Sequence, residues 1–349
     1  MHTRPLPGRV FLVRNPCRIM PPSTTPVVVH KFGGAALSDA AAITNVGMLL
    51  AAHTMEQCHV VVTSALQGVT NQLLAAITCA IAGDHAAARS IAAELRTRHI
   101  EVARGVLADE TTPAAHDALL VRINAACDEL VAQLDSMHAD AQSGALSDVI
   151  LAHGERLAAR IVCAMLLQRG IASVVVDGAA LVQTDGRHGY AAPDLARTDA
   201  TARAVLEPCF AAALTVVVPG FIGAGRDGEV VTLGRGGSDL TATILARALD
   251  AHEVILWKDV PGCMTADPRI VPEARVVPLL DAREASELAY YGAKVLHPRT
   301  LLPLRAGMTL RLRPLPIRRQ PERRSSSDAC RAEHRCVPSP GCRNKRSSQ

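Results

Sequence analysis

The stretch Leu233-Gly234-Arg235-Gly236-Gly237-Ser238-Asp239 decides the fold, because it places three glycines, a guanidinium, a hydroxyl and a carboxylate in one turn. Glycines let a backbone adopt left-handed angles and approach a ligand closely. Residues 240–249 read as a helix with Ser238 or Asp239 as its cap, so the free N–H groups of that helix face the turn. The pattern predicts an anion site between a strand and a helix. A tight connection without a ligand is the simpler alternative.

A second anion site is predicted near the start of the chain. The apolar strand 27–31 runs into Lys31-Phe32-Gly33-Gly34, and a helix follows at about 39–53. The lysine precedes the glycines, unlike in the G-x-x-x-x-G-K-[ST] phosphate loop, and the G-x-G-x-x-G spacing of dinucleotide folds is absent. This site therefore carries its own cation without matching either common motif.

Two further clusters of candidate ligand-binding residues come directly after predicted strands or helices. The loop 258–269 comes directly after the apolar strand 253–257 and contains Lys258, Asp259, Met264 and Arg269. Open parallel sheets bind ligands beyond the carboxyl ends of their strands, which is where this loop is expected. The run Tyr291-Gly292-Ala293-Lys294-Val295 closes a predicted helix and presents another lysine.

The alternation of elements predicts an α/β fold. Predicted helices, among them 148–169 and an Ala-rich region at 77–142, alternate with strands at 27–31, 59–63, 173–177, 214–218 and 253–257. Such alternation favours a mostly parallel central sheet covered by helices on both faces, a three-layer α/β/α sandwich.

Composition excludes two classes of function. No apolar stretch is long and uncharged enough for a membrane span, and 49% hydrophobic residues support a sizeable core. The net charge of +4 comes from residues 305–349, where basic residues outnumber acidic ones, so the remainder is mildly acidic. No aromatic residue for base stacking follows Tyr291, so a nucleic-acid partner is not expected.

The ten cysteines include no C-x-x-C pair, which favours free thiols in a reducing, cytoplasmic compartment. Cys330, His334, Cys336 and Cys342 have the residue types of a zinc site, but their spacing fits no common finger, and no metal ligand is assigned.

Several motifs together resemble the aspartate kinases of the amino acid kinase superfamily. The likeness covers residues 27 to about 308 and is carried, in chain order, by KFGG (31–34), SALQGVTN (64–71), HGER (153–156), GFIG (220–223), LGRGGSD (233–239), KDVPG with TADPR (258–269) and GAKVLHP (292–298). The resemblance implies the amino acid kinase fold and ATP-dependent, Mg²⁺-assisted phosphorylation of the side-chain carboxylate of L-aspartate. That reaction yields 4-phospho-L-aspartate, the entry step to lysine, threonine and methionine.

The resemblance also implies residue roles. Lys31 would bridge the β- and γ-phosphates, and Asp239 would orient Lys31 and Lys294 and help to organise the magnesium; Lys31 and Asp239 are the expected catalytic residues. The expected nucleotide-binding residues are Lys31, Phe32, Gly33, Gly34, Lys258, Asp259, Met264, Arg269, Lys294 and Val295. Expected to bind the amino acid substrate are Ser64, Thr70, Glu155, Arg235, Gly236, Gly237 and Ser238, with Glu155 on the α-ammonium and Arg235 on the α-carboxylate.

The pattern departs from the family at a few positions. Ala35-Ala36 stands where relatives usually have Thr-Ser, Met264 where an aromatic residue is common and Lys258 where threonine is frequent. One lost neutral hydrogen bond costs about 0.5–1.5 kcal/mol, so activity is expected to be reduced at most. Other readings left open are a kinase for glutamate, acetylglutamate, carbamate or UMP, and a truncated, non-catalytic relative that binds partner subunits. Homo-oligomerisation is also left open.

Three segments are expected. Residues 1–26 are Arg- and Pro-rich and read as a disordered extension, 27–308 as the catalytic domain, and 309–349 as a disordered basic tail. In the resembled family, paired regulatory ACT domains follow the kinase domain, and the tail stands in their place. A reading frame truncated or shifted shortly after Leu310 is the hypothesis that follows.

Overall fold

The computed structural model describes residues 11–14, 26–53, 57–107, 113–138, 143–290 and 295–316. The chain divides into Met1–Leu315 and Pro316–Gln349, and the account below concerns the first unit. The predicted cluster of Cys330, His334, Cys336 and Cys342, like Lys294, lies outside the described residues.

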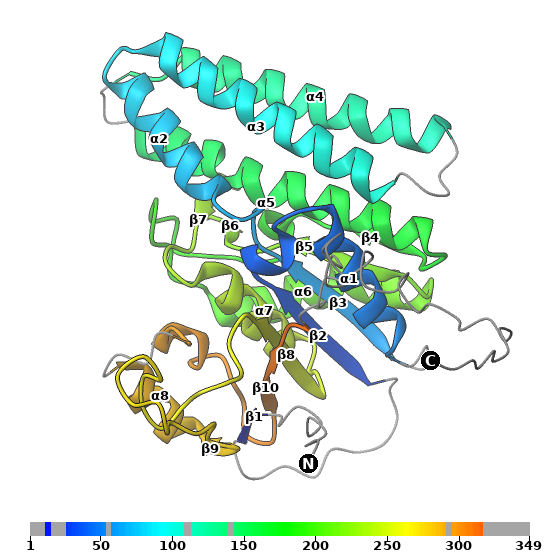
Figure 1. The fold of residues 1–349 in the computed structure, drawn as a ribbon, viewed down its shortest axis with the longest axis vertical. Helices are drawn as coiled ribbons and strands as arrows, with labels where there is room; N and C mark the ends of the chain where they lie inside the picture. The colour runs from blue at the N-terminus through cyan, green and yellow to red at the C-terminus, as the bar shows by residue number, and fades with distance from the viewer. Residues whose placement is uncertain are drawn as a thin grey trace, which may run out of the picture. The chain divides into compact units, whose positions relative to one another are not determined.

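A sheet of eight strands forms the centre of the described chain, in the order β4-β5-β3-β2-β8-β10-β1-β9 (Figure 1). Each neighbouring pair from β4 to β10 is parallel, whereas β1 runs antiparallel to β10. The sequence-predicted parallel sheet is confirmed. The strands are β1 (Phe11–Arg14), β2 (Val27–Phe32), β3 (Cys58–Thr63), β4 (Ser173–Val175), β5 (Thr215–Pro219), β8 (Glu253–Lys258), β9 (Leu279–Asp281) and β10 (Thr309–Pro314). A separate hairpin pairs β6 (Ile222–Ala224) with β7 (Val230–Thr232).

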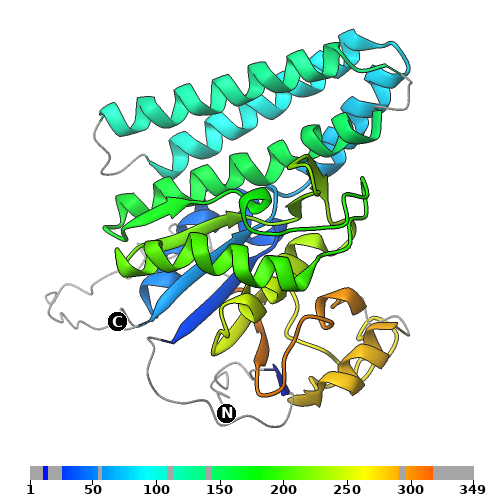
Figure 2. The ribbon, with the colours of Figure 1, turned by 180° about the vertical axis from the view of Figure 1, so that it is seen from behind.

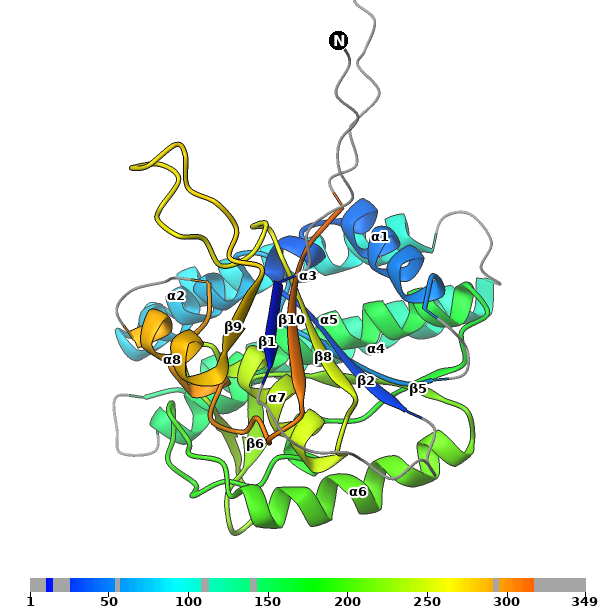
Figure 3. The ribbon, with the colours of Figure 1, turned by 90° about the horizontal axis from the view of Figure 1, so that it is seen from below.

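Strand residues alternate between two hydrophobic cores, one on each face of the sheet. On β2, Val28 and Phe32 belong to the core under α1 to α5, whereas Val29 belongs to the core under α6 to α8. Figure 3 shows the sheet lying between these helix layers, and Figure 2 shows the α6 side. Successive side chains of a strand point to opposite faces, so the three-layer α/β/α sandwich predicted from the alternation is confirmed.

The described ranges contain eight α-helices, of which α5 packs directly against one face of the sheet and α6 and α7 against the other. Residues 77–142 supply the long helices expected from their alanine content, and these pack against α5 (Figure 1). The helices are α1 (Ala40–Ala51), α2 (Val69–Ile81), α3 (His85–Val106), α4 (Pro113–Asp135), α5 (Ser143–Gln168), α6 (Leu195–Ala211), α7 (Gly237–Ala248) and α8 (Ala282–Tyr290). No helix in the described ranges is both long and apolar enough to span a bilayer.

The prediction that Ser238 or Asp239 caps the helix after the glycine turn, α7, is wrong. Helix α7 begins at Gly237, and its N-cap is Gly236, whose φ of 74° lies in the left-handed region that glycine tolerates. Ser238 and Asp239 therefore lie inside the first turn. This position frees the Asp239 carboxylate for partners outside its own helix.

Both predicted chain ends contain strands. β1 lies within the expected extension 1–26, and β10 lies within the expected tail 309–349, so the central sheet extends past residue 308 to Pro314. Leu310 and Leu312 are fully buried, and Arg311 between them pairs with Glu253. The strand was missed because its alternating arginines resemble a basic tail.

Candidate functional site

A buried lysine and a half-buried lysine share one carboxylate at the edge where β2 and β8 end. Lys31 Nζ lies 2.6 Å from Asp239 Oδ1, and Lys258 Nζ lies 2.6 Å from Asp239 Oδ2. Each carboxylate oxygen thus has its own ammonium partner. Three sequence-predicted residues from distant motifs are brought together here.

Strand alternation and register explain how the lysines converge. β2 and β8 are parallel neighbours, with Lys31 opposite Leu256 in the ladder. Leu256 and Val29 belong to the core under α7, and Lys31 and Lys258 lie two residues from them on the same face. Both side chains therefore reach the first turn of α7.

Glycines let α7 approach the end of the sheet closely. A Cβ at Gly220, just after β5, would lie 2.8 Å from Ser238 Cβ, and one at Gly237 would lie 2.7 Å from the Phe221 ring. Such distances leave no room for a side chain at either position. The glycines of GFIG and LGRGGSD thus set the position of Asp239 as well as the shape of the turn.

The site is buried and carries a net positive charge. Lys31 and Asp239 are each 6% exposed. Burial lowers the pKa of Lys31, although Asp239 opposes that shift. Burial acts to raise the pKa of Asp239, but the two lysines outweigh it and hold the pKa below its usual value. One carboxylate between two lysines suits an anion as the next partner.

The turns after β2 and β3 lie side by side at this edge. The Ser64 N–H donates to the Phe32 carbonyl, and a Cβ at Gly34 would lie 3.3 Å from Gln67 Cα. A Cβ at Gly33 would lie 3.3 Å from Lys31 Nζ. Ser64 follows β3, and Thr70 lies in the first turn of α2. Both side chains are half-buried and so remain partly accessible to a ligand.

Glu155 lies on α5 and is 4% exposed. Burial raises the pKa of its carboxyl to about 8, while hydrogen bonding to the Ala65 backbone and the charge of Lys31 oppose the shift. Its Oε2 atom has no hydrogen-bond partner among the described residues. A buried carboxylate oxygen left open in this way suits a cationic group.

Asp148 was not predicted as a site residue, although its carboxylate supports the glycine turn through Thr232. Asp148 is 1% exposed, accepts from the Thr232 hydroxyl at 2.5 Å, and lies 2.9 Å from His188 Nδ1. Thr232 ends β7 immediately before the glycine turn. The signal was an aspartate within an otherwise apolar helical stretch.

Arg299 is a second overlooked residue. Its guanidinium donates to the carbonyls of Leu233 at 2.7 Å and Ala191 at 2.6 Å, and lies 4.1 Å from the centre of the Tyr190 ring. Arg299 thereby fixes the first residue of the glycine turn. It directly follows the motif GAKVLHP, which was the available signal.

Some predicted site residues lie elsewhere. The Phe32 side chain is fully buried on the opposite face, stacked on Trp257 with ring centres 5.8 Å apart, so only its backbone is available to a nucleotide. Val295 packs against the core under α7. Arg269 is exposed and pairs with Asp267 at 2.6 Å, so no described contact brings it to the lysines.

Arg235 and Asp259 are exposed, and Met264 pairs through its backbone with Val276. Gly236 is covered by His297, because a Cβ there would lie 2.8 Å from His297 Cβ. The described residues include no group of three or more His, Cys, Asp or Glu side chains arranged to hold a metal ion.

This chain matches one protein family and several named proteins. Residues 26–313 match the model of the amino acid kinase family. Lysine-sensitive aspartokinase 3 of Escherichia coli K12 is 35% identical over 79% of this chain and 59% of its own length. Aspartokinase 1, chloroplastic, of Arabidopsis thaliana is 32% identical over 80% of this chain and 48% of its own.

Among solved structures, E. coli aspartokinase III in complex with aspartate and ADP superposes with a TM-score of 0.70 at 30% identity. The match covers 82% of this chain and 65% of that one. The chain thus spans less than two thirds of the length of each of these relatives.

Proposed function

The chain belongs to the amino acid kinase family, and from that membership we propose that it transfers the γ-phosphoryl group of ATP to the side-chain carboxylate of L-aspartate. The product is 4-phospho-L-aspartate, the first intermediate toward lysine, threonine and methionine. Aspartokinase relatives, one of them solved with aspartate and ADP, support this choice over other family substrates.

The observation that carries the proposal is the pair of lysines on Asp239. A carboxylate with a pKa of about 3.9 is already a nucleophile at neutral pH, so the transfer needs no general base. It does need cations, because the carboxylate and the phosphates repel each other. Lys31 and Lys258 supply two positive charges at 2.6 Å from the same anchor.

Each residue of the site has a proposed task. Lys31 stabilises charge on the β- and γ-phosphates, and Asp239 holds Lys31 and Lys258 in place. The backbone N–H groups of Gly33 and Gly34 face the phosphates. Further nucleotide contacts are proposed for Asp259 and Met264. The roles expected for Arg269 and Val295 are not carried forward, because both lie elsewhere, and Lys294 lies outside the described residues.

Aspartate is proposed to bind opposite the lysines. Glu155, with its open Oε2 atom, accepts from the α-ammonium. Arg235, exposed at the glycine turn, donates two parallel hydrogen bonds to the α-carboxylate. Hydroxyls of Ser64, Thr70 and Ser238 and the backbone of Gly236 and Gly237 complete the proposed contacts.

Magnesium would enter this site with the nucleotide. Mg²⁺ is commonly bound by substrate phosphates with only one or two carboxylates, and both oxygens of Asp239 are already paired with lysines, so the phosphates would supply most of its ligands. When bound, the ion neutralises phosphate charge. The chain's own residues supply the positioning, because Asp239 orients both ammonium groups.

The test is ATP-dependent hydroxamate formation in hydroxylamine, which traps an acyl phosphate. We expect turnover with L-aspartate and its loss in Lys31→Ala, with Lys345→Ala as the matched control in the basic tail. Turnover with glutamate or acetylglutamate instead of aspartate would assign another acceptor. If the chain is folded and binds ATP but shows no turnover with any acceptor, the result would favour a non-catalytic relative. A cytoplasmic location and a homo-oligomer remain predictions.

A further inference from the structure

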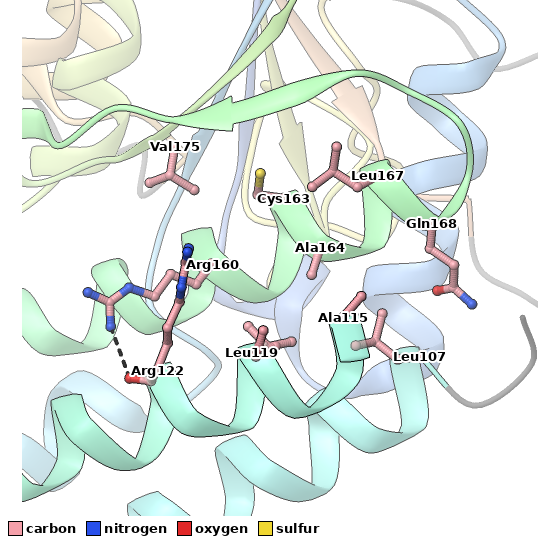
Figure 4. A pocket seen from close by; sticks show the side chains of 11 residues that line it. Leu107, Ala115, Leu119, Arg122, Arg160, Cys163, Ala164, Leu167, Gln168 and Val175 are labelled. Carbon is pink, nitrogen blue, oxygen red and sulfur yellow. Dashed lines mark hydrogen bonds between the residues drawn. The ribbon is translucent and has the colours of Figure 1, made fainter. Parts of the chain in front are cut away.

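A pocket of about 470 Å³ lies between α4 and α5, beside β4 (Figure 4). It falls within the size range of small-molecule sites. Its walls are mainly aliphatic, formed by Leu107, Leu119, Ala164, Leu167 and Val175. None of these residues belongs to the proposed kinase site.

One end of the pocket is cationic. Arg122 from α4 and Arg160 from α5 lie together at this end, away from Leu107 and Gln168 (Figure 4). Arg160 donates to the Arg122 carbonyl at 3.4 Å. Within the described ranges, neither guanidinium has a carboxylate within 4 Å, whereas the neighbouring Arg156 pairs with Asp177 at 2.7 Å.

This arrangement leaves like charges facing one another. Arg160 is half-buried, and burial followed by the charges of Arg156 and Arg122 lowers its pKa, although the more distant carboxylates of Glu129 and Asp177 oppose the shift in part. An anion at this end would relieve that repulsion, because a guanidinium pairs with a carboxylate through two parallel hydrogen bonds. Leu167, which is 54% exposed, offers apolar surface that an aliphatic ligand would cover.

We infer that this pocket binds an amphipathic carboxylate, with its carboxylate on Arg122 and Arg160 and its aliphatic body along Leu119, Ala164 and Leu167. A small carboxylate without an aliphatic body would bury no apolar surface in this pocket. An uncharged aliphatic molecule would leave both guanidinium groups without an anion. Binding at this pocket is independent of phosphoryl transfer.

The test is isothermal titration of the full chain with octanoate below its self-association concentration. We expect saturable binding at one site per chain. Acetate and octanol each lack one half of the recognition and should bind roughly tenfold more weakly or worse. Octylammonium should not bind. The inference would be overturned if octanoate did not bind, whether or not octyl phosphate did. It would also be overturned if octanol bound as tightly as octanoate.

Variants locate the site. Arg122→Gln should weaken octanoate binding by roughly tenfold, and Ala118→Phe, at an exposed position lining the pocket, should block it. Arg160→Gln is the second charge variant should Arg122→Gln fold poorly. Arg283→Gln, an exposed arginine on α8, is the matched control. Unchanged affinity in folded Arg122→Gln and Ala118→Phe would refute the assignment.

Lys31→Ala separates this inference from the proposed kinase activity. That variant should lose turnover and retain octanoate affinity, so each idea fails or stands by itself. Loss of octanoate binding in folded Lys31→Ala would place the ligand in the kinase site and overturn the pocket assignment.

Discussion

Lys31 and Asp239 come from motifs more than two hundred residues apart and meet at 2.6 Å, in a site where each is 6% exposed. The strand supplies the cation and the first turn of α7 supplies the anion. Because Asp239 also pairs with Lys258, which is half-buried, this one carboxylate balances part of the charge of two ammonium groups.

Asp239→Asn should therefore lower both activity and stability. Removing one partner of a buried ion pair typically costs about 3–5 kcal/mol, because the remaining charge stays buried. We expect a loss of that order in the free energy of unfolding at neutral pH, measured by urea denaturation, together with loss of hydroxamate formation. Asp227→Asn, in an exposed turn, is the control. Full activity in Asp239→Asn would remove this carboxylate from the mechanism.

Glu155 should make aspartate binding depend on pH. Its pKa of about 8 leaves the carboxyl mostly protonated at neutral pH, whereas the substrate ammonium prefers the carboxylate. The KM for aspartate should thus fall roughly tenfold per pH unit as pH rises toward about 8, and then level off. Initial rates across this range provide the measurement. Glu155→Gln should raise KM and flatten the profile; an unchanged slope in that variant would contradict the assignment.

Arg299→Lys should loosen the glycine turn without removing positive charge. Lysine lacks the planar fork that reaches both the Leu233 and Ala191 carbonyls. Since Arg299 is half-buried, we expect a modest effect on stability, of about 1–2 kcal/mol. The KM for aspartate should rise more than kcat falls, which marks a positioning role. A loss confined to kcat would indicate direct participation in the transfer instead.

Acid should destabilise the fold through buried neutral histidines. Burial lowers the pKa of His30 well below 6.5, and neighbouring His53 and His59 add to this; burial also lowers the pKa values of His99 and His153 to about 4. Between the folded and unfolded pKa values the unfolded chain binds more protons, so stability is lost as pH falls below about 6.5.

Urea denaturation at about pH 7.5 and pH 5.5 measures this loss. His30→Met should reduce it by removing one contributor, whereas His138→Ala, at an exposed position, should leave it unchanged. An equal pH dependence in His30→Met and the parent chain would show that His30 does not contribute.

Much of the site could be predicted because its motifs are local. KFGG and LGRGGSD each place a charged side chain beside glycines at the end of a strand, and both are found at one edge of the sheet. Arg299 and Asp148 were missed because their roles depend on carbonyls and hydroxyls of other segments. The Phe32 side chain lies on the face opposite to Lys31, because successive strand residues alternate, so its expected nucleotide contact stays a prediction for the backbone alone.

The sequence by itself determined the α/β class, the central strands and the residue types of the anion site, because these follow from short-range periodicity and backbone preferences. Only the tertiary structure decided the strand order, the place of β10 in the sheet and the pairing of both lysines with Asp239. The reason is physical. The register between distant strands fixes which face each side chain occupies, so the partners of a buried charge such as that of Lys31 depend on segments that sequence spacing does not reveal.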